Sequence, residues 1–203
     1  MGTCLLTAGH SKTPGPLPKT QGNSAAAVRK PNGVQFASDS AGTDDSVFLR
    51  LLVKASESRR ILQIGSYKRS DTLQLAKGAA AAKGEITAVG FSQWRRKQLI
   101  HRLQAADLVG CVHFSNGHLA NTLLRLKGPF DFVFFDLPSD LYLHCLKVVE
   151  PLLASGALIV SGNLRYLGSK CRWARAYRCE LDRLGLKSVR LQIGEGFAVS
   201  IKP

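Results

Sequence analysis

The stretch that most constrains the fold is Phe130–Phe135, which reads FDFVFF and is followed by Asp136. An almost uninterrupted run of aromatic and β-branched residues is typical of a strand that is covered on both faces, as in a parallel sheet. Parallel neighbours cannot be joined by a tight turn, so helices must lie between consecutive strands. The stretch therefore predicts an α/β protein with Asp136 at the carboxyl end of a central strand.

Strand and helix patterns alternate on both sides of this run. We expect strands at 61–65, 85–89, 112–114, 130–135, 157–160, 188–193 and 197–201, and helices at 44–55, 70–82, 92–106, 119–126, 139–150 and 169–184. Gly194-Glu195-Gly196 between the last two strands is typical of a hairpin. The pattern predicts a Rossmann-like, doubly wound, mostly parallel seven-stranded sheet with an antiparallel C-terminal hairpin strand. Ligands of such sheets bind at the carboxyl ends of the strands.

Residues 1–42 differ in composition from the rest of the chain. They contain four prolines among many Ser, Gly and Ala residues, and no acidic residue precedes Asp39. Such a segment cannot bury enough apolar area to offset its chain entropy. We expect a basic, extended or disordered arm over 1–42 and a folded domain over 43–203. An organellar transit segment has a similar composition, and that alternative stays open.

The net charge is +14, from 28 Lys and Arg residues against 14 Asp and Glu residues. This excess is typical of proteins that lie beside RNA or another polyanion, although a merely basic surface gives the same count. The five cysteines include no CxxC pair, so they indicate neither a disulfide framework nor a zinc site. We expect a reducing intracellular compartment, either a mitochondrion or other organelle or the cytoplasm. No apolar run approaches the roughly 20 residues that span a bilayer.

Two of the expected helices combine tryptophan with cations. Trp94 and Trp173 each lie among arginine and lysine residues, a combination that suits stacking on bases together with phosphate contacts. The alternative is a tryptophan packed inward beside solvated cations, and the pattern of 92–106 indicates that Trp94 faces inward with Leu99, Ile100 and Leu103. The residues that we expect to contact a nucleic acid or protein partner are Arg95, Arg96, Lys97, Lys170, Arg172, Trp173, Arg175 and Arg178.

Four segments carry a family resemblance. They are Leu62-Gln63-Ile64-Gly65, then 130–137 (FDFVFFDL), 150–163 (EPLLASGALIVSGN) and 191–197 (LQIGEGF). In this order they resemble the cation-dependent O-methyltransferases, the group that contains caffeoyl-CoA and catechol O-methyltransferases, over about residues 44–203. The resemblance implies a class I S-adenosylmethionine-dependent methyltransferase fold. The positions that it implies for the cofactor pocket are Gly65, Ser66, Tyr67, Gly90, Gly117 and His118.

The acidic residues of that family's cofactor site are missing. Gln63 stands where the family has its first-strand acid, Gly90 where it has the acid for the ribose hydroxyls, and His118 where it has the acid near adenine. Lys68 and Arg69 occupy the first turn, so we expect the pocket to be obstructed or repurposed unless these cations point outward. We therefore expect a vestigial pocket and no cofactor, with S-adenosylmethionine as the cofactor if the protein is active.

The family's metal ligands are also incomplete. The resemblance implies two aspartates and an asparagine, of which Asp136 and Asn163 remain while Gly162 replaces the middle ligand. A single carboxylate with one amide is a poor cage for a hard dication. Ser139 stands where the family has a lysine base, and a serine hydroxyl is a poor base near neutral pH. We expect no metal. Asp136 is the catalytic candidate if the protein is active, and a strand-end helix cap otherwise.

Three functions fit these observations. The first is a methyltransferase-like protein that has lost catalysis and acts as a basic structural subunit of a larger assembly. The basic surface and the arm would then contact protein or RNA partners, as in an organellar ribosome-like particle. The second is an active, metal-independent S-adenosylmethionine-dependent O-methyltransferase. The third is a basic domain that binds nucleic acid by itself.

Overall fold

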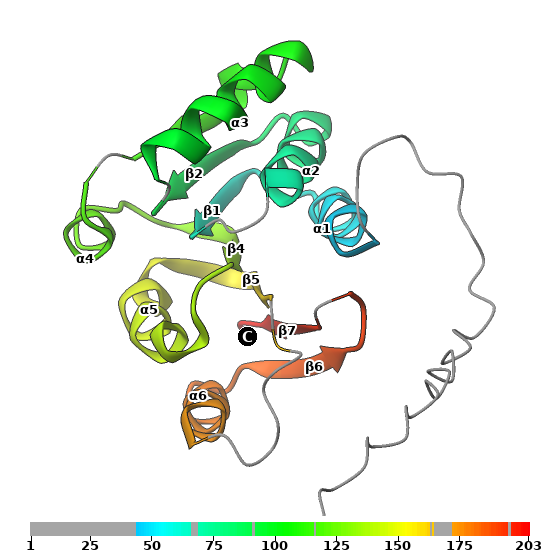
Figure 1. The fold of residues 1–203 in the computed structure, drawn as a ribbon. Helices are drawn as coiled ribbons and strands as arrows, with labels where there is room; N and C mark the ends of the chain where they lie inside the picture. Colours follow the sequence, from blue (N-terminus) through cyan, green and yellow to red (C-terminus); the bar gives the residue numbers. More distant parts are fainter. Residues whose placement is uncertain are drawn as a thin grey trace, which may run out of the picture. The chain divides into compact units, whose positions relative to one another are not determined.

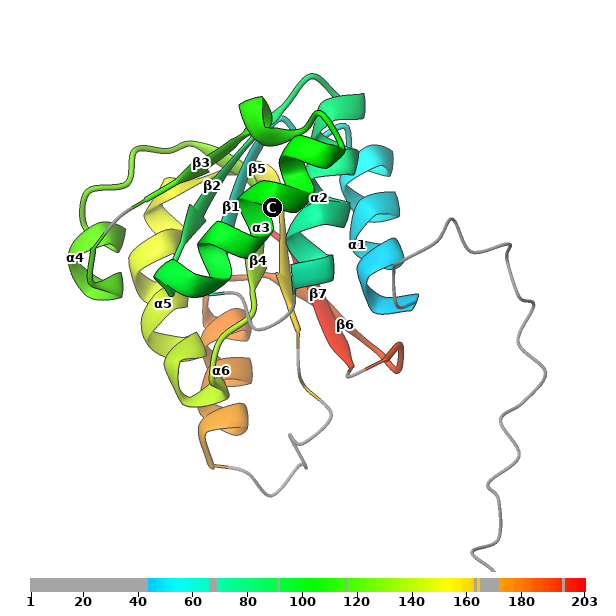
Figure 2. The ribbon, with the colours of Figure 1, turned by 45° about the horizontal axis from the view of Figure 1, so that its top comes forward.

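The computed structural model describes residues 44–65, 69–90, 92–115, 117–162, 164, 172–194 and 196–203. Within them, seven strands form one sheet in the order β3-β2-β1-β4-β5-β7-β6, with helices on both sides (Figures 1 and 2). This confirms the predicted seven-stranded Rossmann-like sheet. The arm predicted over 1–42 lies outside the described residues.

The elements follow the predicted alternation closely. The strands are β1 (Arg60–Ile64), β2 (Glu85–Val89), β3 (Val112–Phe114), β4 (Phe130–Phe135), β5 (Leu153–Ser161), β6 (Lys187–Leu191) and β7 (Phe197–Ile201). The helices are α1 (Asp44–Ala55), α2 (Arg69–Ala81), α3 (Gln93–Ala105), α4 (Leu119–Leu123), α5 (Tyr142–Val149) and α6 (Arg172–Arg183). Short 3-10 turns occupy Val109–Cys111, Ser139–Leu141 and Glu150–Leu152.

Several predicted bounds were wrong: the expected helix 119–126 ends at Leu123, and the expected strand 188–193 ends at Leu191. Two larger differences have a local cause. The expected helix 139–150 is shorter, because 3-10 turns flank α5 and Pro151 lies at the start of the second turn. The expected strand 157–160 is longer, because Leu153 pairs with Phe130 across a register shift in β4.

The five strands from β3 to β5 run parallel, and β7 lies antiparallel between β5 and β6. The last two strands pair directly, from Lys187 opposite Ile201 to Leu191 opposite Phe197, which confirms the predicted hairpin. Ile64, the last residue of β1, pairs with the last residues of β2 and β4. The carboxyl ends of these three strands therefore meet at one edge of the sheet, which we call the carboxyl edge.

Each face of the sheet has its own apolar core. Helices α1, α2 and α3 cover one face, and α4, α5 and α6 cover the other (Figure 1). Successive residues of β4 alternate between the two cores, since Val133 and Phe135 belong to one and Phe132 and Phe134 to the other. This double burial explains the continuous apolar run of β4. Among the described helices, none has the length and apolar character needed to cross a bilayer.

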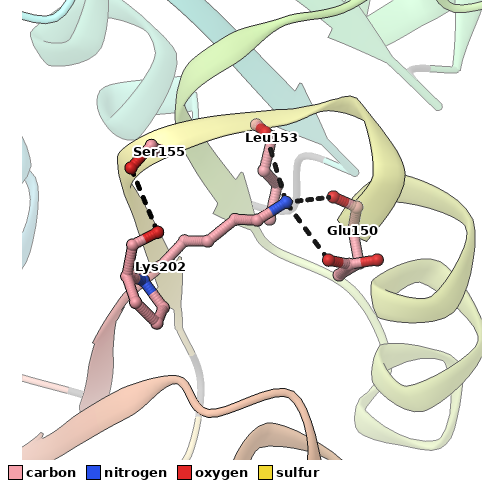
Figure 3. A network of polar contacts seen from close by, with 5 residues as sticks. Glu150, Leu153, Ser155 and Lys202 are labelled. Atoms are coloured by element: carbon pink, nitrogen blue, oxygen red, sulfur yellow. Dashed lines mark hydrogen bonds and ion pairs between the residues drawn. The ribbon is translucent and has the colours of Figure 1, made fainter.

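A polar network ties the end of β7 to the start of β5 (Figure 3). The Lys202 Nζ lies 3.1 Å from the Glu150 carboxylate and donates to the carbonyl oxygens of Glu150 at 3.2 Å and Leu153 at 3.3 Å. The Ser155 hydroxyl donates to the Pro203 carbonyl at 3.1 Å. Because β5 begins here and ends beside the carboxyl end of β4, this network lies at the opposite end of the strand from Asp136.

Candidate functional site

The carboxyl edge begins with a close backbone contact between Gly65 and Asp136. The Asp136 amide donates to the Ile64 carbonyl at 2.9 Å, and the Gly65 amide donates to the Val89 carbonyl at 2.8 Å. Gly65 has φ +80°, and a Cβ at this position would collide with the Asp136 carbonyl oxygen. Only glycine satisfies both conditions, so the predicted Gly65 is required where the chain leaves β1.

Gly90 follows β2 directly and packs against the backbone of Gly65. Its φ is +92°, and a Cβ there would lie 3.4 Å from the Gly65 nitrogen and 3.7 Å from the Leu119 Cδ1. Leu119 begins α4 immediately after Gly117 and His118. The structure therefore brings the predicted positions Gly65 and Gly90 together, with Gly117 and His118 leading into the neighbouring helix. Ser66 and Tyr67 lie outside the described residues.

A pocket of about 290 Å³ lies at the His118 side of this edge. Its lining residues are Ser115, Gly117, His118, Asn121, Thr122, Arg125 and Leu126, and none of these is acidic. The His118 side chain makes no capping hydrogen bond to α4. The pocket is therefore polar and partly cationic where the family resemblance implies a carboxylate.

The side chain of Gln63 is fully buried on β1 just before the turn. Among the described residues, neither its amide nitrogen nor its amide oxygen has a hydrogen-bond partner, and the same is true of the buried Thr72 hydroxyl on α2. An unpaired buried polar group costs about 1–3 kcal/mol relative to a paired one. Gln63 thus fills the position of the family's first-strand acid with a neutral and unsatisfied group.

Asp71 is a carboxylate that the sequence analysis did not assign to this edge. It is 3% exposed in the first turn of α2, and the Ser70 hydroxyl lies 3.2 Å from its carboxylate. A helix N-terminus favours a negative charge at such a position. In the sequence, Asp71 could be recognised only as an acid that follows the first strand by a few residues. In the structure it lies in the first turn of α2, the helix after β1, and not directly after β2 as Gly90 does.

The position of the missing metal ligand is filled by aromatic rings. A Cβ on Gly162 would lie 3.2 Å from the Phe134 ring and 3.4 Å from the Phe197 ring. Asp136 is 4% exposed at the end of β4, as predicted, while Asn163 and the Ser139 side chain lie outside what the structure describes. The part of the chain that the structure describes contains no group of three His, Cys, Asp or Glu residues that could hold a metal ion. Of the implied ligands, the described residues supply only the Asp136 carboxylate, which by itself does not fit a divalent ion.

Two buried tyrosines tie the ends of β4 and β5 to the helices beneath them. The Tyr142 hydroxyl donates to the Gly162 carbonyl at 2.6 Å, and the Tyr177 hydroxyl lies 2.7 Å from the Ser161 hydroxyl. Burial raises the pKa of Tyr142, and the Asp136 charge raises it further. Burial also raises the pKa of Tyr177. Both phenols stay protonated at neutral pH, so they act as structural hydrogen-bonding groups, a role that the sequence analysis missed.

Comparisons with known proteins agree with this architecture. Residues 26–178 match the model of a family described as O-methyltransferase. The chain belongs to this O-methyltransferase family.

Named relatives are similar over part of their length. The chain is 28% identical over 141 residues to a catechol O-methyltransferase of Mycobacterium tuberculosis, a match that covers 69% of this chain and 64% of that protein. It is 28% identical over 131 residues to a caffeoyl-CoA O-methyltransferase of Eucalyptus globulus, which covers 62% of this chain and 53% of that protein. The chain thus matches about half to two thirds of the length of these relatives.

Solved structures share the fold. Cofactor-bound Rv0187 from MTB is 27% identical, with a TM-score of 0.66 over 80% of this chain and 81% of that one. An O-methyltransferase from Bacillus cereus in complex with SAH is 20% identical, with a TM-score of 0.68 over 80% of this chain and 82% of that one. The second likeness supports the fold alone.

The family implies S-adenosylmethionine, and the residues of this chain fit that cofactor only in part. Part of the backbone cradle remains, since Gly65 and Gly90 bring no side chains of their own to the carboxyl edge. At the two positions where the resemblance implies acids for the adenosine, the chain has Gly90 and His118, neither of which carries a carboxylate. Glu85 cannot take the place of the missing ribose acid, because it lies at the other end of β2 from Gly90. Its carboxylate lies 3.3 Å from the His113 Nε2. The described residues of this member therefore lack the adenosine contacts that the resemblance implies.

The two basic helices lie on opposite faces of the sheet, so the structure does not join them into one surface. Helix α3 packs on the core of α1 and α2, and α6 packs on the core of α4 and α5. Arg172, Arg175 and Arg178 are exposed on α6, as expected, and Lys170 lies outside the described residues.

The prediction that Trp94 faces inward was wrong. Its exposed fraction is 65%, whereas Leu99 and Leu103 are fully buried. Trp94 precedes Leu99 by five positions, which is about 140° around a helix of 3.6 residues per turn. Ile100 is half-buried. Trp173, in contrast, is half-buried and packs against the apolar core, as the inward alternative required.

Proposed function

We propose that this member of the O-methyltransferase family no longer transfers methyl groups and acts as a basic structural subunit of a larger, RNA-containing assembly. The observation that best supports the loss of methyl transfer is the glycine at position 90, directly after β2. It replaces the acid that the resemblance implies for the ribose, and its φ of +92° is a backbone conformation that side-chain-bearing residues rarely adopt. The backbone at this point is thus suited to glycine.

The energetic consequence of the missing acids is large. A hydrogen bond to a charged group contributes about 1.5–3 kcal/mol, which corresponds to roughly a 10- to 150-fold change in affinity. Two such contacts are absent, at Gly90 and at His118. The metal position adds to this loss, because the Phe134 and Phe197 rings fill the space beside Gly162.

The charge of the chain supports the second half of the proposal. The net charge is +14, and exposed cations lie on helices that cover both faces of the sheet. Cations on two faces suit a subunit that is surrounded by polyanionic partners better than an enzyme that meets one small substrate.

A metal-independent O-methyltransferase is the second candidate. Asp71 favours it, because this carboxylate is buried in the first turn of α2, the helix that follows β1 and Gln63. The glycine cradle and the names of the relatives also favour it.

Calorimetric titration of the full chain with S-adenosylmethionine and S-adenosylhomocysteine tests the loss of catalysis. The expected result is no saturable binding at micromolar concentrations, with the catechol O-methyltransferase of Mycobacterium tuberculosis as a positive control in the same buffer. Micromolar binding that is weakened by Asp71→Asn, in a variant whose circular dichroism is unchanged, would instead contradict the expected loss of the cofactor site and favour the second candidate.

The assembly is tested separately, by affinity purification of the full chain from its native extract. The expected result is co-purification with RNA and a defined set of proteins, and nuclease treatment is expected to release part of that set. Migration of the protein alone, at the size of a monomer, contradicts the structural-subunit half of the proposal.

A further inference from the structure

Helix α3 presents an exposed stripe that combines an indole ring with cations. Trp94, Lys97 and His101 are exposed, and their spacing of three and then four residues places them on one side of the helix. Leu99 and Leu103 hold the opposite side against the core. The position of the stripe is therefore fixed by two buried leucines rather than by the exposed residues themselves.

Further cations flank the stripe, and acidic residues are absent from the helix. Arg102 is exposed, and Arg95 and Arg96 are half-buried in the first turn. The Arg96 guanidinium carbon lies 5.2 Å from the centroid of the Phe114 ring on β3, so this cation is held beside the carboxyl edge. The chain has no acidic residue between Glu85 and Asp107. The positive charge of α3 is therefore not neutralised from within the helix.

The N-terminus of α3 is well defined, which fixes the backbone that carries the exposed ring. Ser92 is the N-cap, and its hydroxyl accepts a hydrogen bond from the Arg95 amide at 3.4 Å. Trp94 lies in this capped first turn, shortly after Gly90 at the carboxyl edge. The backbone of a capped turn is already ordered, so binding on its side chain requires no further ordering of that backbone.

We propose that the exposed stripe of α3 binds single-stranded nucleic acid, with Trp94 stacking on an unpaired base while Lys97, Arg95 and Arg102 contact phosphates. A flat ring beside several cations matches the two chemical parts of a single strand, the base and the phosphate. Duplexes keep their bases stacked and offer no free face to the indole. This interaction goes beyond the proposed loss of catalysis and does not depend on it.

Fluorescence anisotropy of the full chain with a short labelled single-stranded RNA tests the proposal. Saturable binding is expected. In a plot of the logarithm of the association constant against the logarithm of the salt concentration, each phosphate contact should contribute a slope of about −0.7. Trp94→Ala should weaken binding on the order of tenfold, and Trp94→Phe should weaken it less, since stacking on an aromatic ring is retained in part. Lys97→Ala should reduce the salt slope by about 0.7.

Matched controls separate stacking from general charge and from folding. Lys147→Ala removes an exposed cation from α5 on the other face, and Leu124→Ala removes another exposed apolar side chain. Both are expected to bind the RNA as the unmodified chain does. In a Trp173→Phe background, Trp94 is the remaining tryptophan, and its emission should be quenched on RNA binding.

Three results would overturn the proposal. The first is absence of RNA binding by the full chain at low salt. The second is equal affinity of Trp94→Ala and the unmodified chain, with circular dichroism showing that both are folded. The third is equal affinity for duplex RNA or heparin, which would mean that charge alone drives binding. None of these results bears on the titration with S-adenosylmethionine, so the two proposals can fail independently.

Discussion

Helices α3 and α6 are similar in sequence and differ in which way their tryptophan faces. Each contains a tryptophan among arginine residues, and each covers a different face of the sheet (Figure 1). In α3 two leucines contact the core and Trp94 lies outside, whereas in α6 Trp173 packs inward. A tryptophan in a basic helix therefore indicates a binding surface only when it lies away from the buried stripe.

The two helices also differ in how their charge is balanced. Helix α3 contains no acidic residue, but α6 contains Glu180 and Asp182. The Arg183 guanidinium donates to the Glu180 carboxylate at 2.8 Å, and part of the charge of α6 is thus neutralised within the helix. This difference supports α3 rather than α6 as the nucleic-acid surface.

The largest expected difference between the helices is in the stability effect of removing the tryptophan. Trp173→Ala should lower the free energy of unfolding by about 2–3 kcal/mol, because it leaves a gap against the core. Trp94→Ala should change it by less than about 0.5 kcal/mol, because an exposed side chain is removed. Urea unfolding of both variants measures this contrast. Equal losses would mean that the two tryptophans are packed alike.

A smaller effect is expected from the polar anchor of α6. Tyr177→Phe removes the hydrogen bond to the buried Ser161 hydroxyl and should cost about 1–2 kcal/mol in thermal or urea unfolding. Ser161→Ala supplies the matched background, because it removes the same contact from the strand side. In that background Tyr177→Phe should cost much less, since the phenol has already lost this partner. An equal cost in both backgrounds would show that the Ser161 contact contributes little.

The smallest expected effect concerns the pH response of the ion pair in α6. The hydrogen bond from Arg183 and its charge lower the pKa of Glu180 below the usual value. A lowered pKa in the folded state adds stability above the unfolded pKa of about 4.3, and this stability is lost as the pH falls through the folded pKa. An NMR titration of Glu180 should show the pKa returning toward its usual value in Arg183→Ala. An unchanged pKa in that variant would exclude the pair as its cause.

The sequence was sufficient to predict the sheet, because periodicity and apolar runs report burial directly. The run from Phe130 to Phe135 is such a case, since both faces of β4 are covered. The same reasoning failed at Trp94, because an aromatic residue in the first turn was assigned to the buried side without regard to its angle from Leu99.

The site was predicted less completely than the sheet. Gly65, Gly90 and Asp136 could be placed at the carboxyl edge, because each follows a parallel strand. The packing of Phe134 and Phe197 beside Gly162 could not, because it depends on a contact between residues that are distant in sequence. The buried Asp71 was missed for a related reason, since the sequence shows an acid shortly after a strand but does not show that its side chain is buried.

The contact between Gly65 and the Asp136 carbonyl has a consequence for how such chains are classified. No side chain can enter this space without displacing β4, whether or not a small molecule ever binds. Selection for a stable sheet alone would keep the glycine long after an activity had disappeared. Surveys that count this residue as a mark of an enzyme will therefore include descendants that have ceased to be enzymes.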